Sequence, residues 1–268
     1  MKITSFMETA KSGIKVFKPI QYLHIVGATK ENVNLSDVKL RARIVSSESG
    51  RVEEIIPLVG LDVLGEITSM NEGFFKCFQQ ATFGKEEFAV NVMLHPTSAV
   101  YLSNDKYLEV DIQGLDNSVE TSIYGLEMPV IDKNFICRYN KFYMAAGELQ
   151  KTFAVGDNEN LILPGRSFDE VTLHYKNGSS CSYTKAELGA MMMLKNDVVS
   201  VHRLDLSSTS LGKSSTTGSG NDQYNYFNMY FGYRSLFGLD VSEVNEFTIR
   251  RTSSTESFEF ILMDTIVD

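Results

Sequence analysis

Residues 38–47, Val-Lys-Leu-Arg-Ala-Arg-Ile-Val-Ser-Ser, alternate between apolar and charged side chains. Every second residue from Val38 to Ile44 is apolar, and Lys39, Arg41 and Arg43 lie between them. Because successive side chains of a strand point to opposite faces of a sheet, this stretch predicts a half-buried strand whose basic face meets water.

Similar alternation, or a short apolar run, recurs along most of the chain. In residues 107–112, for example, Glu109 and Asp111 alternate with apolar residues and are predicted to lie on the wet face of an antiparallel sheet. The predicted strands are 22–26, 38–47, 52–56, 88–94, 107–112, 122–128, 141–145, 150–155, 170–175, 180–183, 198–204, 224–230, 246–251 and 257–263. Many short strands separated by turns predict an all-β fold.

Only two segments have helical periodicity. From Leu58 to Met70, apolar residues recur every third position after Pro57, which suits the first turn of a helix. A second helix is predicted from Lys185 to Leu194, because Thr184-Lys185-Ala186-Glu187 forms a capping box that satisfies free backbone donors. The sequence therefore predicts an all-β protein with a few short helices.

Each predicted helix follows the same order of elements. A short apolar strand, a longer strand, a turn and a short strand precede it, and the second turn contains the hairpin pair Asn177-Gly178. Corresponding elements are about half of the 268 residues apart. This layout predicts two β-domains of one topology at residues 19–150 and 151–268, after an N-terminal arm at residues 1–18.

Composition argues against several classes of protein. The net charge is −9 and lysine and arginine do not cluster, which disfavours nucleic-acid binding. No apolar run is long enough for a secretory signal or a membrane helix, so we expect synthesis in the cytoplasm. Three widely spaced cysteines, Cys77, Cys137 and Cys181, predict free thiols rather than a zinc or redox site.

The sequence contains no motif for catalysis. No nucleophile elbow is present, and Gly212-Lys213-Ser214 lacks the first glycine of a phosphate-binding loop. The histidines have no metal-ligand spacing and are interpreted as structural or surface residues; they are His24, His95, His174 and His202. We therefore expect no catalytic residue and no cofactor.

The weak candidates for a metal site are Asp157 and Glu159, in the segment Asp157-Asn158-Glu159-Asn160. Their carboxylates suit a structural calcium ion, but the segment lacks the spaced pattern of a dedicated calcium loop. An acidic, turn-forming linker is the favoured interpretation.

Residues 224–233 are unusually rich in tyrosine and phenylalanine. Tyr224, Tyr226 and Tyr230 would share one face of a strand, and Tyr233 follows them. Because tyrosine is enriched at interfaces, these four residues are candidates for a protein contact, although the same face could instead half-bury on its own domain. The preceding Ser/Thr/Gly-rich stretch, residues 207–222, predicts an exposed loop.

Two β-rich halves with one order of elements, a short polar arm and no export signal resemble the double jelly-roll major capsid proteins of small, icosahedral, membrane-containing bacteriophages. The resemblance is architectural, covers nearly the whole chain and transfers no residue role. It implies two tandem jelly-roll β-sandwiches, and trimers of pseudo-hexagonal outline that tile an icosahedral shell. The implied partners are further copies of the chain and other virion proteins, such as penton or membrane-associated proteins, without direct nucleic-acid contact. The implied location is the virion.

Two other classes stay open at this point. In a receptor-binding spike or a carbohydrate-binding β-sandwich module, residues 207–222 and 224–233 would form the binding site. A jelly-roll glycosidase or lyase would need carboxylates or histidines that converge in one cleft. The absence of tryptophan weighs against sugar binding.

Overall fold

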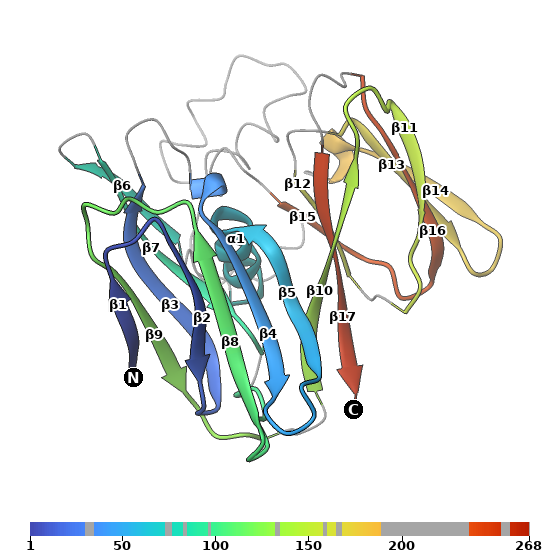
Figure 1. Cartoon of the computed structure of the whole chain (residues 1–268). Helices are drawn as coiled ribbons and strands as arrows, with labels where there is room; N and C mark the ends of the chain where they lie inside the picture. The colour runs from blue at the N-terminus through green and yellow to red at the C-terminus, as the bar shows by residue number, and fades with distance from the viewer. Residues whose placement is uncertain are drawn as a thin grey trace, which may run out of the picture. The chain divides into compact units, whose positions relative to one another are not determined.

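The chain folds into two compact units in the computed structural model (Figure 1). The described residues are 1–29, 35–72, 77–82, 85–95, 98–131, 135–157, 160–164, 168–188, 236–252 and 258–267. The first unit comprises Met1–Lys141 and Met263–Asp268, and the second comprises Phe142–Leu262. Strands β10 (Phe135–Met144) and β17 (Phe258–Val267) therefore contribute residues to both units.

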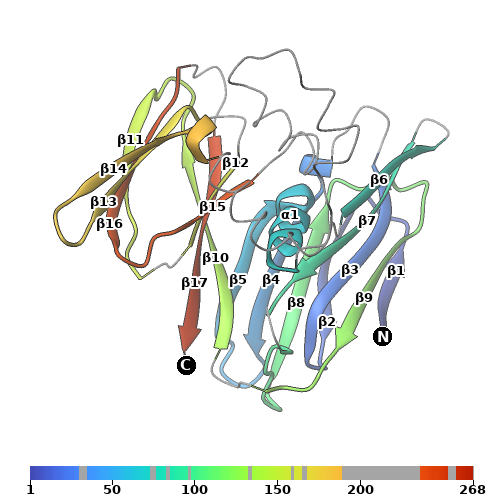
Figure 2. The same ribbon diagram turned by 180° about the vertical axis from the view of Figure 1, so that it is seen from behind.

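The first unit contains two antiparallel sheets. One has the order β1-β9-β3-β7-β6 and the other has the order β2-β8-β4-β5 (Figures 1 and 2). The strands are β1 (Lys2–Phe6), β2 (Ala10–Val16), β3 (Ile20–Thr29), β4 (Lys39–Ser46), β5 (Val52–Gly60), β6 (Cys77–Thr82), β7 (Lys85–Met93), β8 (Lys106–Gln113) and β9 (Thr121–Glu127). The short helix η1 (Leu35–Asp37) precedes β4, and the helix α1 (Leu61–Glu72) packs against β7 and β5.

The second unit repeats this strand order. Its sheets are β10-β17-β12-β15 and β11-β16-β13-β14. The remaining strands are β11 (Gln150–Ala154), β12 (Asn160–Pro164), β13 (Glu170–Tyr175), β14 (Ser180–Thr184), β15 (Leu236–Asp240) and β16 (Val244–Arg250). The first unit has one extra strand, β6. Apart from β6, the first strand of each unit pairs with its last, and the second strand pairs with the one before last. That is the jelly-roll arrangement, so the predicted tandem jelly rolls are confirmed.

The alternating residues 38–47 contain β4 and show the burial that their pattern predicts. Val38 and, on β4, Leu40, Ala42 and Ile44 are buried, whereas the basic residues between them are partly exposed. Strand β8 lies beside β4 in the sheet and pairs Asp111 with Arg41. Apolar burial on one face, at about 25 cal/mol per Å² of buried apolar surface, therefore fixes which face of this sheet meets water.

The core of the second unit contains an aromatic cluster among aliphatic side chains. Phe153 and Phe260 form an edge-to-face pair with 4.8 Å between ring centroids, and Phe142 stacks on Phe260 at 5.7 Å. Phe247 on β16 completes the cluster, so these four rings join β11 and β16 of one sheet to β10 and β17 of the other. Aromatic contacts of this kind hold the two layers of the sandwich together.

The predicted N-terminal arm and domain boundary need correction. Residues 1–18 contain β1 and β2, which pair with β9 and β8 inside the first jelly roll. A register shift between Lys11 and Ile14 interrupts the alternation of β2 and hides that strand in the sequence. The strand order also assigns β10 to the second jelly roll, so the division predicted at residue 150 falls one strand too late.

The first helix prediction differs in extent from the structure, and the second is described only over its first residues. Helix α1 begins at Leu61 rather than Leu58, because Val59 and Gly60 extend β5 and pair with β4. The capping box of the second helix is present: Thr184 N donates to Glu187 Oε2 at 2.7 Å, and Glu187 N donates to Thr184 Oγ1 at 3.3 Å. Residues 185–188 are helical, and the predicted continuation to residue 194 lies outside the described residues.

Thr68 ties α1 to the end of β7. Its buried hydroxyl donates to Leu64 O at 3.0 Å and accepts the Met93 N–H at 3.0 Å. Thr68→Val keeps the shape of the side chain but leaves the Met93 N–H without this acceptor. We expect the free energy of unfolding in urea to fall by about 2 kcal/mol. Thr152→Val removes an exposed hydroxyl pair and serves as the control, with less than about 0.5 kcal/mol expected. Equal effects of the two variants would contradict the assigned role.

Candidate interaction surfaces

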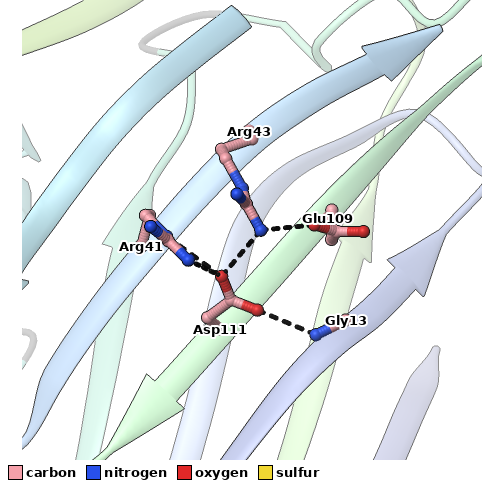
Figure 3. Close-up of polar contacts among 5 residues, drawn as sticks. All are labelled: Gly13, Arg41, Arg43, Glu109 and Asp111. Carbon is pink, nitrogen blue, oxygen red and sulfur yellow. Dashed lines mark hydrogen bonds and ion pairs between the residues drawn. The ribbon is translucent and has the colours of Figure 1, made fainter. Parts of the chain in front are cut away.

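The outer face of the β2-β8-β4-β5 sheet carries an ordered charge cluster. Asp111 Oδ2 accepts from Arg41 Nε at 3.0 Å and Arg41 Nη2 at 2.7 Å (Figure 3). Arg43 Nη2 donates to the same oxygen at 2.9 Å and also to Glu109 Oε1. The acidic residues lie on β8 and the basic residues lie on the neighbouring strand β4.

Gly13 donates a further hydrogen bond to Asp111. Its φ of 69° lies in the left-handed region that favours glycine, and it sits at the bulge where β2 shifts register against β8. This geometry directs the Gly13 N–H to Asp111 Oδ1 at 2.8 Å (Figure 3). Both carboxylate oxygens of Asp111 are therefore satisfied by partners on the two adjacent strands.

The environment of Asp111 favours its charged form. Burial, the largest single influence, raises the pKa of this carboxyl, but the Gly13 hydrogen bond and the charges of Arg41 and Arg43 together outweigh it. The pKa of Asp111 consequently lies below its ordinary value. Carboxylates held by arginines in this way are poor candidates for a general acid, so Glu109 and Asp111 fit a structural role.

An apolar row lies beside the charge cluster on the same face. Val45 on β4 pairs with Tyr107 on β8 and with Val52 on β5. Phe17, which follows β2, contacts Tyr107 with 5.6 Å between ring centroids. The two ends of the row are the most exposed, with 68% of Phe17 and 52% of Val52 accessible to solvent. Large apolar side chains gathered on one face are typical of interaction surfaces.

The opposite sheet of the first unit also exposes apolar side chains. Tyr124 and Leu126 alternate on β9, and Val26 on β3 is exposed near them. His24 lies in the same cross-strand row as Tyr124, and its Nδ1 is 2.6 Å from Asn91 Oδ1. His24 is therefore partly buried among neutral neighbours.

In the second unit, the sheet that matches β2-β8-β4-β5 in strand order has an outer face rich in hydroxyl groups. On the β11-β16-β13-β14 sheet, Thr152 contacts Thr248 at 2.8 Å between hydroxyl oxygens, and Thr172 contacts Ser182 at 2.8 Å. His174 lies between Ser180 Oγ at 2.9 Å and Thr248 Oγ1 at 3.0 Å. The two jelly rolls therefore present chemically different outer faces on matching sheets.

The tyrosine surface predicted from the sequence cannot be placed. Tyr224, Tyr226, Tyr230 and Tyr233 lie outside the described residues, as do His202 and the Ser/Thr/Gly-rich stretch at residues 207–222. The four tyrosines therefore stay predictions.

The candidate metal site is described only in part. Asp157 is an exposed turn residue, and Glu159 lies outside the described residues. Within the part of the chain that the structure describes, no three histidine, cysteine or acidic side chains gather as a metal site would require. The proposal of structural calcium is therefore untested.

Cys181 has a free thiol and is partly exposed. Among the described residues, no helix has the length and apolar character needed to cross a membrane.

Comparison with known proteins gives structural matches alone. No family model matches the sequence, and no curated protein is similar to it. The structure is similar to the major capsid protein P2 from bacteriophage PM2, with 11% identity, a TM-score of 0.53, and coverage of 100% of this chain and 97% of that chain. A weaker likeness links it to the structure of Sulfolobus turreted icosahedral virus, with 12% identity, a TM-score of 0.48 and coverage of 100% and 90%. The chain thus shares its fold, over its full length, with the P2 protein.

Proposed function

We propose that the chain is a major capsid protein that forms homotrimers, and that neighbouring trimers build an icosahedral shell around a virion. The observation that carries the proposal is the pair of jelly rolls with one strand order in a single chain. The full-length likeness to the P2 capsid protein supports it further. At this level of identity the likeness concerns the fold, so the role in a shell is an inference from architecture.

The physical basis of the proposal is that two similar units per chain make a trimer nearly sixfold. Three copies place six jelly rolls around one axis, and such an outline can tile a closed surface. Contacts within the trimer would be heterologous and ring-closing. Tyr224, Tyr226, Tyr230 and Tyr233 stay candidates for contacts with neighbouring copies. The remaining partners would be other virion proteins, and the charge of −9 gives no reason to add nucleic acid.

We expect the purified chain to form a stable particle of three copies of the 30.0 kDa chain. Light scattering behind a sizing column measures this mass, and electron microscopy of concentrated samples tests for closed shells. A trimer that never forms shells would favour the receptor-binding spike. A chain that stays monomeric at high concentration would contradict the capsid proposal and would favour a binding module or an enzyme.

A further inference from the structure

The charge cluster and the apolar row together form a face that is complementary to itself. We propose that two copies of this chain meet through the outer face of the β2-β8-β4-β5 sheet, related by a two-fold axis that runs parallel to the strands between β8 and β4. This contact is additional to the proposed trimer, and in a shell it would join one trimer to its neighbour.

The first argument is the order of charges across the sheet. Lys15 on β2 lies opposite Glu109 on β8, Glu109 lies opposite Arg43 on β4, and Arg43 lies opposite Glu54 on β5. The row is therefore basic, acidic, basic, acidic from one edge of the sheet to the other. A rotation of 180° about an axis between β8 and β4 generates the second copy and places every charge of this row against an opposite charge of that copy. Lys15 then meets Glu54 of the second copy, and Glu109 meets the second copy's Arg43.

The next row obeys the same rule. Asp111 on β8 and Arg41 on β4 are the central residues of that row. The same axis places Asp111 over the second copy's Arg41. On the central strands, β8 thus contributes the acidic side chains and β4 contributes the basic ones. Neighbouring strands of one chain thus pair opposite charges, and the same alternation, carried out to Lys15 on β2 and Glu54 on β5, makes the face complementary to a second copy of itself.

The apolar row supplies contact area under the same symmetry. Its two ends, Phe17 and Val52, are its most exposed members and would lie against each other across the axis. Tyr107 would lie over Val45 of the second copy, and Lys15, whose Nζ is 4.7 Å from the centre of the Tyr107 ring, would border the aromatic contact. Exposed aromatic residues next to arginine are the usual anchors of protein interfaces.

The test uses the exposed ends of the charged row, which can be changed without disturbing Asp111. We expect Lys15→Glu alone to weaken pairing about fivefold, because it sets two acidic side chains against each other at both ends of the contact. Glu54→Lys alone should have the same effect. The double variant Lys15→Glu with Glu54→Lys restores opposite charges and should pair with itself about as well as the wild type. Mixed with the wild type, it should form mixed pairs about fivefold more weakly than either chain pairs with itself.

Two further variants test the apolar contact and the specificity of the charge effect. Phe17→Ser removes the most exposed ring and should weaken pairing about tenfold. The control is the double variant Glu170→Arg with Arg250→Glu, which exchanges an exposed ion pair on the matching sheet of the second jelly roll and should leave pairing unchanged.

The measurement is light-scattering mass against protein concentration at low and high salt. Mixed pairing is measured by co-purification of a tagged wild-type chain with the untagged double variant. Pairing that salt and Phe17→Ser weaken, and that the double variant restores, supports the contact. A wild type that does not associate beyond its basic particle, a double variant no better than the single ones, or free mixing with the wild type would overturn it. The basic particle, trimer or not, is read from the low-concentration mass, so failure of the trimer proposal is seen separately.

Discussion

Asp111→Ala is expected to lower the free energy of unfolding by about 3 kcal/mol. The side chain of Asp111 is only 9% exposed, and it accepts hydrogen bonds from Gly13, Arg41 and Arg43. Its removal leaves two partly buried guanidinium groups and the bulge of β2 without their shared acceptor. The cost is therefore dominated by unpaired donors rather than by lost ion-pair attraction. Urea unfolding followed by circular dichroism measures it.

The control for this variant is Glu170→Ala. Glu170 forms an ion pair with Arg250 on the matching sheet of the second jelly roll, but Arg250 is 57% exposed. Exposed pairs contribute little, so a change below about 1 kcal/mol is expected. Equal losses of unfolding free energy in the two variants would mean that Asp111 stabilises its sheet no more than an exposed ion pair does.

The stabilising effect of Asp111 should also depend on pH. Because its pKa is lowered in the folded state, the carboxylate stabilises the fold above the pKa of the unfolded chain, about 3.9, and this stabilisation is lost as the pH falls through the folded-state pKa. The difference in unfolding free energy between the wild type and Asp111→Asn should be constant above about pH 5 and shrink below about pH 4. Other carboxylates titrate in both proteins and largely cancel. A difference that grows on acidification would contradict the lowered pKa.

The β-rich content was predictable because strands and caps depend on local patterns, whereas the jelly-roll arrangement pairs distant strands and was implied only by the architectural resemblance. Alternation in residues 38–47 and the capping box at Thr184 each follow from a few neighbouring residues, and both are present. Strand β2 was missed because its pattern depends on a residue that is distant in the sequence. Its alternation is broken at Gly13, and the reason for the break is a carboxylate 98 positions further along the chain.

Which side chains meet on each surface depends on how neighbouring strands align, and this register cannot be read from a single sequence. Arg43 and Glu109 could each be assigned to a wet face, but their pairing requires the alignment of β4 with β8. Phe17 had no periodic signal because it lies just beyond β2, and its neighbour Tyr107 is distant in sequence. The start of α1 was misplaced because the apolar spacing from Leu58 onward fits a helix as well as a strand end, and pairing with β4 decides between them.

Gly114→Ala is expected to lower the free energy of unfolding by about 4 kcal/mol. Gly114 directly follows β8 and has a φ of 87°. A Cβ at this position would lie 2.3 Å from the carbonyl oxygen of Asp37 and 3.1 Å from the Cα of Val38. These are backbone atoms, so no side-chain rotation relieves the overlap. The cost therefore adds a steric clash to the strain of a left-handed backbone.

The backbone on both sides of Gly114 is held in place, which is why the clash should not relax. The Val38 N–H donates to Leu35 O at 3.2 Å, and Val38 O accepts the Leu61 N–H at 2.8 Å. On the other side, the Leu115 N–H donates to Thr9 O at 3.0 Å. A shift that made room for the methyl group would break hydrogen bonds to η1, α1 or the segment before β2. The matched control is Gly50→Ala, because Gly50 has a φ of 66° but no atom within 4 Å of the added Cβ. It should cost only about 1 kcal/mol in urea unfolding. Equal losses in the two variants would mean that backbone conformation alone, and not the close approach of β8 to Asp37, makes glycine necessary at position 114.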